Sequence, residues 1–138
     1  MRYLGLDLGS KTLGMALSDA SGLIASPYQV IRHNENYEQL LSEVKRVVEE
    51  KNVQEIVLGL PKNMNNTIGE KGNLSLLFKS QLEDLLKIPV HLQDERLTTV
   101  EAQNILLKQD ASRKKRKQVI DEVAATIILQ SYLDRKGN

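Results

Sequence analysis

The chain has 138 residues, of which 41% are hydrophobic and 27% charged, a composition typical of one soluble globular domain. It contains no cysteine, which excludes disulfide bonds and thiolate metal sites, and a net charge of +1 points to no particular partner. The apolar runs are too short for a membrane-spanning helix and no signal-peptide pattern is present, so we expect a single cytoplasmic domain over residues 1–138.

The first nineteen residues predict a β-hairpin that brings an aspartate to the end of a strand. Its strands span 3–8 and 11–18, and Gly9-Ser10 forms the turn between them. Side chains alternate along the first strand, with Leu4, Leu6 and Leu8 on one face and Tyr3, Gly5 and Asp7 on the other. Glycines inside strands often mark a close approach of a ligand or another backbone, so Gly5 and Gly14 indicate room beside Asp7.

The rest of the chain alternates strands with helices. Beyond the hairpin we expect a strand at 26–32, a helix at 34–51, a strand at 55–60, a loop at 62–72, a helix at 73–86, a strand at 90–93 and helices at 98–108 and 118–133. Pro27 indicates that the strand at 26–32 lies at a sheet edge. Three antiparallel strands followed by two strand–helix units predict an α/β fold, with the later strands parallel to the first and helices covering a mixed sheet.

Acidic residues that are far apart in the sequence are expected to meet at one edge of this sheet. Asp7 lies near the end of the first strand and Asp94-Glu95 at the end of the last, and parallel strands bring their carboxyl ends together where ligands bind. Asp121 lies in the first turn of the last helix, on a face of small and apolar residues. The alternatives are ordinary: an acid near a helix N-terminus is favoured by the helix dipole, and Asp94 or Glu95 could pair with Arg96.

Carboxylates gathered in this way require protons or a cation, because their charges repel one another. The chain has no cysteine, and we interpret His33 and His91 as non-ligands, so the fitting cation is Mg²⁺ or Mn²⁺. Two such ions roughly 4 Å apart can activate a water and stabilise the leaving oxygen in phosphodiester hydrolysis. The acids therefore indicate a metal-dependent nuclease.

Four stretches of the chain together resemble the YqgF/RuvX family: LGLDLGSKTLGMALSD, VLGLPKNMNNTIG, QDERLTT and DEVAATIIL. The resemblance covers nearly the whole chain, with the motifs in the family's order. It implies a ribonuclease H-like fold, a mixed five-stranded central sheet flanked by helices. It also implies a hydrolase acting on ester bonds, an endonuclease that processes the 5′ end of the small-subunit ribosomal RNA precursor during ribosome biogenesis.

The resemblance also implies which residues are catalytic and hold the metal: Asp7 from the first strand, Glu95 from the DER motif and Asp121 from the last helix. Alternation puts Asp94 and Glu95 on opposite faces, so we expect only one of them at the metals. The family pattern favours Glu95.

Basic residues next to these acids are candidate contacts for the phosphate backbone of a nucleic acid. Five lie in one run, which we place in a loop before the last helix: Arg113, Lys114, Lys115, Arg116 and Lys117. Lys11 and Arg96 are neighbours of the proposed acids in the sequence and are expected to contact the scissile phosphate. The alternative for the run is a solvated loop.

Several functions remain open on sequence alone. The family is also linked to Holliday junction resolution, which requires two active sites related by a two-fold axis and therefore a dimer. A non-catalytic RNA-binding module would keep the basic run without the chemistry. A sugar-kinase-type phosphotransferase also begins with a DxG strand, but no second phosphate-binding hairpin follows here. The expected partners are structured RNA precursors, ribosomal precursor particles or branched DNA, with no membrane, and the protein is expected to be a monomer or weak homodimer.

Overall fold

The structure is a computed structural model that describes residues 1–63, 65, 67–95 and 113–136, with the backbone alone described for 113–122. Its elements are β1 (Tyr3–Leu8), β2 (Thr12–Ser18), β3 (Ala25–Arg32), α1 (Tyr37–Lys51), β4 (Glu55–Leu60), α2 (Glu70–Leu86), β5 (Val90–Asp94) and α4 (Arg113–Lys136). The helix expected at 98–108 lies outside the described residues. None of the described helices is both long enough and apolar enough to cross a bilayer.

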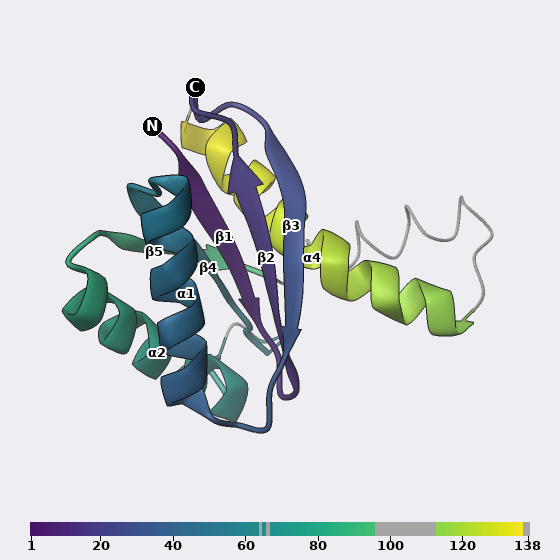
Figure 1. The fold of residues 1–138 in the computed structure, drawn as a ribbon. Coiled ribbons are helices and arrows are strands. Elements are labelled where there is room, and N and C mark those ends of the chain that lie inside the picture. Colours follow the sequence, from purple (N-terminus) through teal and green to yellow (C-terminus); the bar gives the residue numbers. More distant parts are fainter. Residues whose placement is uncertain (64, 66, 96–112, 137–138) are drawn as a thin grey trace.

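The five strands form one mixed sheet in the order β3-β2-β1-β4-β5 (Figure 1). β1, β2 and β3 pair antiparallel, and β4 and β5 run parallel to β1. The prediction of a mixed five-stranded sheet is therefore confirmed, with β3 at an edge as Pro27 indicated. Because β1, β4 and β5 point the same way, their carboxyl ends lie at one edge of the sheet.

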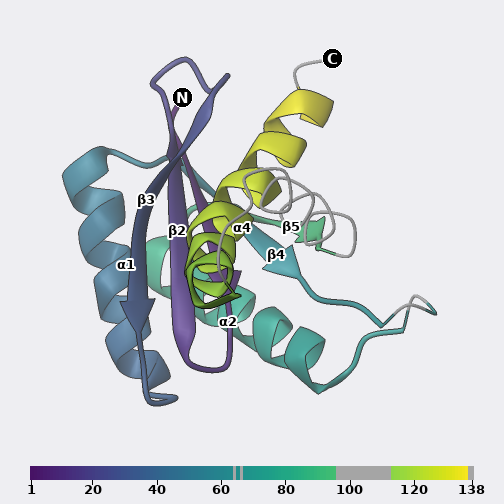
Figure 2. The ribbon, with the colours of Figure 1, turned by 90° about the vertical axis from the view of Figure 1, so that its right-hand side faces the viewer.

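Helices cover both faces of the sheet, with α1 and α2 on one side and α4 on the other (Figures 1 and 2). The α1/α2 side contains the larger core, which includes Leu4 and Leu6 of β1 and Phe78 of α2. The α4 side contains Tyr3 of β1 and Ile128 of α4. The two predicted faces of the first strand are thus confirmed, and Asp7 lies on the α4 side by alternation.

α4 packs tightly on β1 at Gly5. A Cβ atom at that position would lie 2.7 Å from Leu129 Cβ and 2.9 Å from the Ala125 carbonyl oxygen, closer than van der Waals contact allows. The glycine therefore sets the distance between helix and strand, and the close approach expected from its position in the strand is found here.

Replacing Gly5 by Ala is expected to lower the free energy of unfolding by about 2 kcal/mol, because overpacking a close helix–strand contact strains both backbones. Urea denaturation measures the change. Gly69→Ala is the control: its Cβ would meet no atom closer than 3.4 Å, so only the loss of glycine at the N-cap of α2 is expected, at about 1 kcal/mol or less. Equal losses in the two variants would contradict the close-packing explanation.

Two predictions about the helices are wrong in part. α2 begins at Glu70, earlier than expected, and its buried side chains include Ser75, Phe78 and Leu82. Leu74, Leu77 and Leu85 share the helical spacing that usually marks a core-facing stripe, yet they are exposed. α4 begins at Arg113, so the basic run forms its first turns and does not lie in a loop.

Candidate active site

The structure brings two of the three predicted catalytic acids together. Asp7 is on the last part of β1, and Glu95 immediately follows β5. Their carboxyl groups are joined by a hydrogen bond. Since β4 lies between β1 and β5, the two side chains meet across the end of β4.

Gly59 of β4 makes this meeting possible. A Cβ atom at Gly59 would lie 2.8 Å from both Cγ and Cδ of Glu95 and 2.7 Å from Ile128 Cδ1. A side chain there would occupy the space that the glutamate fills. The Glu95 backbone is fixed as well, because its N–H donates to the carbonyl of Leu60 at 3.2 Å. Because Gly59 has no side chain, Glu95 can reach across the end of β4 towards Asp7 on β1.

Burial, the hydrogen bond with Asp7 and the charges of Asp7 and Asp94 raise the pKa of Glu95 to about 10. The positive charge of Lys71 opposes this rise. Near neutral pH, Glu95 therefore keeps a proton and donates it to the Asp7 carboxylate. A carboxyl pair that shares one proton is the arrangement expected when two acids are forced together without a cation.

The donor set of this pair fits a hard divalent cation. It offers carboxylate oxygens only, the ligands that Mg²⁺ and Mn²⁺ prefer, and a cation could replace the shared proton as the neutralising charge. Among the residues whose side chains the structure describes, no group of three potential ligands is assembled. A third protein ligand would have to come from the part of the chain outside those side chains, or be replaced by water or substrate oxygens.

Asp121 and Asp94 have different positions relative to this pair. Asp121 lies in α4, one turn before Ala125, whose carbonyl oxygen adjoins Gly5 on β1, but its side chain is outside the described part of the structure. Asp94 is the last residue of β5 and pairs with Leu60. Its charge acts on Glu95, but Glu95 is the acid that contacts Asp7.

The structure describes the predicted phosphate contacts to different extents. Lys11 is exposed in the β1–β2 turn, next to the end of β1. The run from Arg113 to Lys117 is helical and precedes Asp121 on the same helix, with its side chains outside the described part. Arg96 is also outside the described residues.

His33 holds the turn that follows Asp7, a role that sequence reasoning missed. The buried imidazole lies with Nε2 2.9 Å from the carbonyl oxygen of Gly9 and accepts the N–H of Glu35 at Nδ1, 3.0 Å away. A nitrogen facing a carbonyl must donate and one facing an N–H must accept, so the ring is neutral with its proton on Nε2. Its backbone N–H also donates to the carbonyl of Lys11. His33 thus connects the β1–β2 turn to the segment before α1.

Replacing His33 by Ala is expected to lower the free energy of unfolding by about 2 kcal/mol, because a partly buried carbonyl and a backbone N–H lose their partner. Urea denaturation measures this. His91→Ala is the control, since His91 is partly exposed and pairs with Glu55 near the surface, and it should cost less. A loss for His33→Ala no larger than that for His91→Ala would contradict the role of His33 in the turn.

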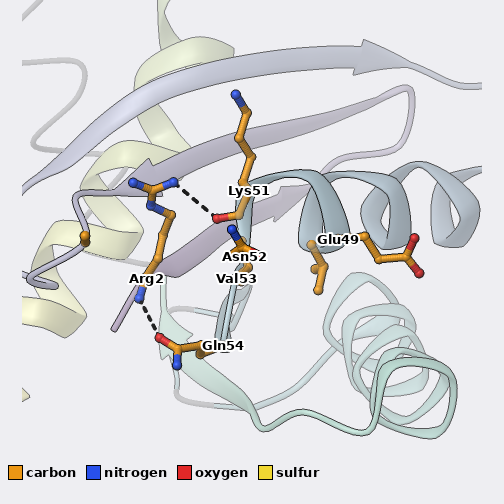
Figure 3. Close-up of a pocket in the computed structure, with 8 residues that line it drawn as sticks. Arg2, Glu49, Lys51, Asn52, Val53 and Gln54 are labelled. Atoms are coloured by element: carbon orange, nitrogen blue, oxygen red, sulfur yellow. Dashed lines mark hydrogen bonds between the residues drawn. The ribbon is translucent and has the colours of Figure 1, made fainter.

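A wider groove lies at the opposite end of β1 and is not part of this site. It has a volume of about 650 Å³ and is lined by Arg2, Glu49, Lys51 and Gln54 among others (Figure 3). The Arg2 backbone N–H donates to Gln54 Oε1 at 3.2 Å, and Arg2 Nη1 donates to the Lys51 carbonyl at 3.2 Å. These contacts connect the start of β1 to the α1–β4 connection, far from the paired carboxyl groups.

Comparison with known proteins places the chain in a family. The sequence profile of RuvX, described as a Holliday junction resolvase, matches residues 1–135. A protein of Oceanobacillus iheyensis named "Putative pre-16S rRNA nuclease" is 48% identical over 137 residues, which cover 99% of this chain and 100% of the relative. A protein of the same name from Listeria monocytogenes serotype 4b is 51% identical over 135 residues, covering 97% of this chain and 98% of the relative.

The fold also matches that of a solved structure. Thermus thermophilus RuvC, solved in complex with a Holliday junction substrate, superimposes with a TM-score of 0.60 at 16% identity, over 99% of this chain and 96% of that one. At this identity the likeness shows the fold alone, which is ribonuclease H-like, as the sequence resemblance implied. The match to the family over nearly the full length carries more than the fold, and it shows that the chain belongs to the RuvX family.

Proposed function

We propose that this protein is a divalent-metal-dependent nuclease that processes the 5′ end of the 16S ribosomal RNA precursor. The observation that supports the chemistry is the contact between Asp7 and Glu95 at the carboxyl edge of the sheet. The full-length relatives that are named for pre-16S rRNA support the choice of substrate.

Asp7, Glu95 and Asp121 are the residues that would hold the metal ions. When bound, Mg²⁺ or Mn²⁺ would supply a more acidic water and charge stabilisation for the leaving oxygen. Glu95 must give up its proton to become a ligand, and the positive charge of Lys71 favours that loss. The hydrogen bond between Gly9 and His33 fixes the turn that follows Asp7, and packing against Gly59 fixes the Glu95 side chain. These contacts would keep both carboxyl groups in position when substrate binds.

The basic residues bind the substrate in this proposal. Lys11 from the β1–β2 turn and the run Arg113 to Lys117 from α4 would contact phosphate groups, which provides affinity without reading the base sequence. Aromatic residues make up only 4% of the chain, so base stacking is expected to contribute little. We therefore expect recognition of backbone and shape, with the cleavage position set by the structure of the RNA.

Holliday junction resolution is the second candidate, and the description of the family profile favours it. It makes a separate demand, because symmetric cleavage of a four-way junction needs two copies of the site related by a two-fold axis. A monomer that cleaves RNA would exclude this candidate and leave the first.

The test is a cleavage assay that offers both substrates to the purified protein. Precursor RNA spanning the 5′ end of 16S rRNA and a four-way DNA junction are incubated with Mg²⁺, with Mn²⁺ and with EDTA. We expect metal-dependent cleavage of the RNA near the mature 5′ end and little cleavage of the junction. Cleavage of the junction alone would favour the resolvase, and binding of RNA with no cleavage under any condition would favour the non-catalytic module.

A further inference from the structure

A small hollow lies at the same edge of the sheet as the paired acids, on the α1/α2 side. It has a volume of about 60 Å³ and is lined by Leu8, Gly9, Ser10, Glu35, Tyr37, Lys71 and Leu74. Its first three residues are those that directly follow Asp7. A space of this size holds a few water-sized groups and is too small for a nucleobase. It would therefore accept the oxygens of a phosphate but not a base.

Lys71 connects this hollow to the acids. It is exposed in the first turn of α2 and lines the hollow, and its charge also acts on Glu95. Its positive charge therefore acts both in the hollow and on Glu95. It comes from α2, so it reaches the edge from the face of the sheet opposite α4.

The walls of the hollow are held in place by buried groups. The Tyr37 ring lies 6.5 Å from the ring of Phe78 and 5.9 Å from that of His33, measured between centroids. His33 in turn contacts Gly9 and Glu35 through its two ring nitrogens. A site with fixed walls loses little freedom when a ligand binds, which favours binding.

The hollow is lined by one positively charged and one negatively charged side chain. Lys71 is its cation and Glu35 is its acid, and Lys11 lies in the adjoining turn. Glu35 is exposed, with its backbone in the left-handed region at φ 61°, and its N–H bonds to His33. Its carboxylate would oppose an anion in the hollow, whereas Lys71 would attract one.

We propose that Lys71 and the Gly9-Ser10 turn form a subsite for one phosphate of the nucleic-acid strand, the neighbour of the phosphate that is cleaved. The proposal rests on the proposed function for its ligand, a nucleic-acid backbone. It makes Lys71 a substrate-binding residue on the face of the sheet opposite α4. The nucleic-acid strand would then be held by Lys71 from one face and by the basic run of α4 from the other.

The test is binding of the precursor RNA fragment in EDTA, where no cleavage occurs, measured by fluorescence anisotropy at several KCl concentrations. Lys71→Gln is expected to weaken binding about tenfold near 0.1 M salt and to reduce the salt slope by about one, the value for one lost phosphate contact. Lys71→Arg should restore binding to within about threefold, because a guanidinium also binds phosphate. Glu35→Gln should bind severalfold tighter.

Matched controls separate a local contact from a general effect of charge. Lys79→Gln removes a positive charge from the same helix, where Lys79 pairs with Glu83, and Glu38→Gln removes an exposed acid from the first turn of α1. Both are expected to leave affinity within about twofold. Lys71→Gln and Lys79→Gln with the same affinity and slope would overturn the subsite, as would a wild-type protein that does not bind the RNA.

The outcomes for the subsite and for the nuclease are distinguishable. If the wild-type protein cleaves RNA with Mg²⁺ or Mn²⁺ but Lys71→Gln binds normally, the subsite is wrong and the nuclease stands. If Lys71→Gln loses affinity and salt slope as expected but no variant cleaves, the subsite stands and the nuclease is wrong. Thermal melting of each variant checks that the fold is retained.

Discussion

Asp7→Asn is expected to abolish metal-dependent cleavage, with a loss of at least about a thousandfold in rate. The asparagine keeps the shape of the side chain but removes the charge that would bind the metal ions and that now accepts the proton of Glu95. Loss of a bound metal removes several kcal/mol of transition-state stabilisation, and each 1.4 kcal/mol is about tenfold in rate. Single-turnover cleavage of the precursor RNA with Mg²⁺ and with Mn²⁺ measures the effect.

The control for this variant is Asp84→Asn, which neutralises an exposed acid on α2 far along the helix from Lys71. It should cleave at the wild-type rate. Asp7→Asn should still bind RNA in EDTA, because its basic residues are unchanged. Metal-dependent cleavage by Asp7→Asn at a rate near that of the wild type would remove Asp7 from the mechanism and, with it, the site as proposed.

Glu95→Gln is expected to remove part of the pH dependence of stability in the metal-free protein. The pKa of Glu95 is raised to about 10 in the folded state, above its value in the unfolded chain. The folded protein therefore binds more protons than the unfolded one between about pH 4.5 and 10, and Glu95 makes wild-type stability fall as pH rises through this window. Glutamine is uncharged at every pH and can still donate to Asp7, so this part of the pH dependence disappears.

The measurement is urea denaturation in EDTA at pH 5, 7 and 9. At pH 5 the two proteins should differ little, and at pH 9 Glu95→Gln should be the more stable by on the order of 1–2 kcal/mol. Glu38→Gln, an exposed acid on α1, should show no such trend. A difference between wild type and Glu95→Gln that stays constant from pH 5 to 9 would contradict the protonated state of Glu95 in the folded protein.

Metal addition should stabilise the wild type more than Glu95→Gln, whereas raising the pH without metal stabilises Glu95→Gln relative to the wild type. Mg²⁺ or Mn²⁺ should raise the melting temperature of the wild type more at pH 8 than at pH 6, since a ligand carboxyl must lose its proton to bind. Glu95→Gln lacks that carboxylate, so the shift should be smaller, and cleavage should fall by at least about a hundredfold. Equal metal-induced shifts in the two proteins would exclude Glu95 as a ligand.

The parts of the fold that depend on the two-residue alternation of side chains in a strand were predictable from the sequence. The alternation in β1 separated Leu4 and Leu6 from Gly5 and Asp7, and the structure has them on opposite faces of the sheet. The rule that parallel strands end at one edge was enough to expect Asp7 near the Asp94-Glu95 pair, while the choice of Glu95 came from the family resemblance. That Asp7 and Glu95 touch depends on Gly59, which pairs with Gln93 on β5 and leaves the space that the Glu95 side chain fills, a relation that cannot be read from local pattern.

The parts that depend on tertiary packing were not predictable. Leucines at helical spacing suggested a core stripe on α2, but the helix turns Ser75 and Phe78 inward and leaves Leu77 exposed, because Gly72 lets its first turns approach Pro61. Five consecutive basic residues suggested a loop, yet Arg and Lys are good helix formers and the run forms the start of α4. His33 and Lys71 gave no local signal, since their roles come from partners distant in the sequence.

The position of β5 has a consequence for how activity is lost. Among the described residues, this five-residue strand lies at the edge of the sheet and pairs with β4 alone, and Glu95 follows its end. Marginal strands open in local fluctuations that cost less than global denaturation. Detachment of β5 would separate the glutamate from Asp7 while β1, β2 and β3 remain paired. Inactivation on heating should therefore precede the main unfolding transition.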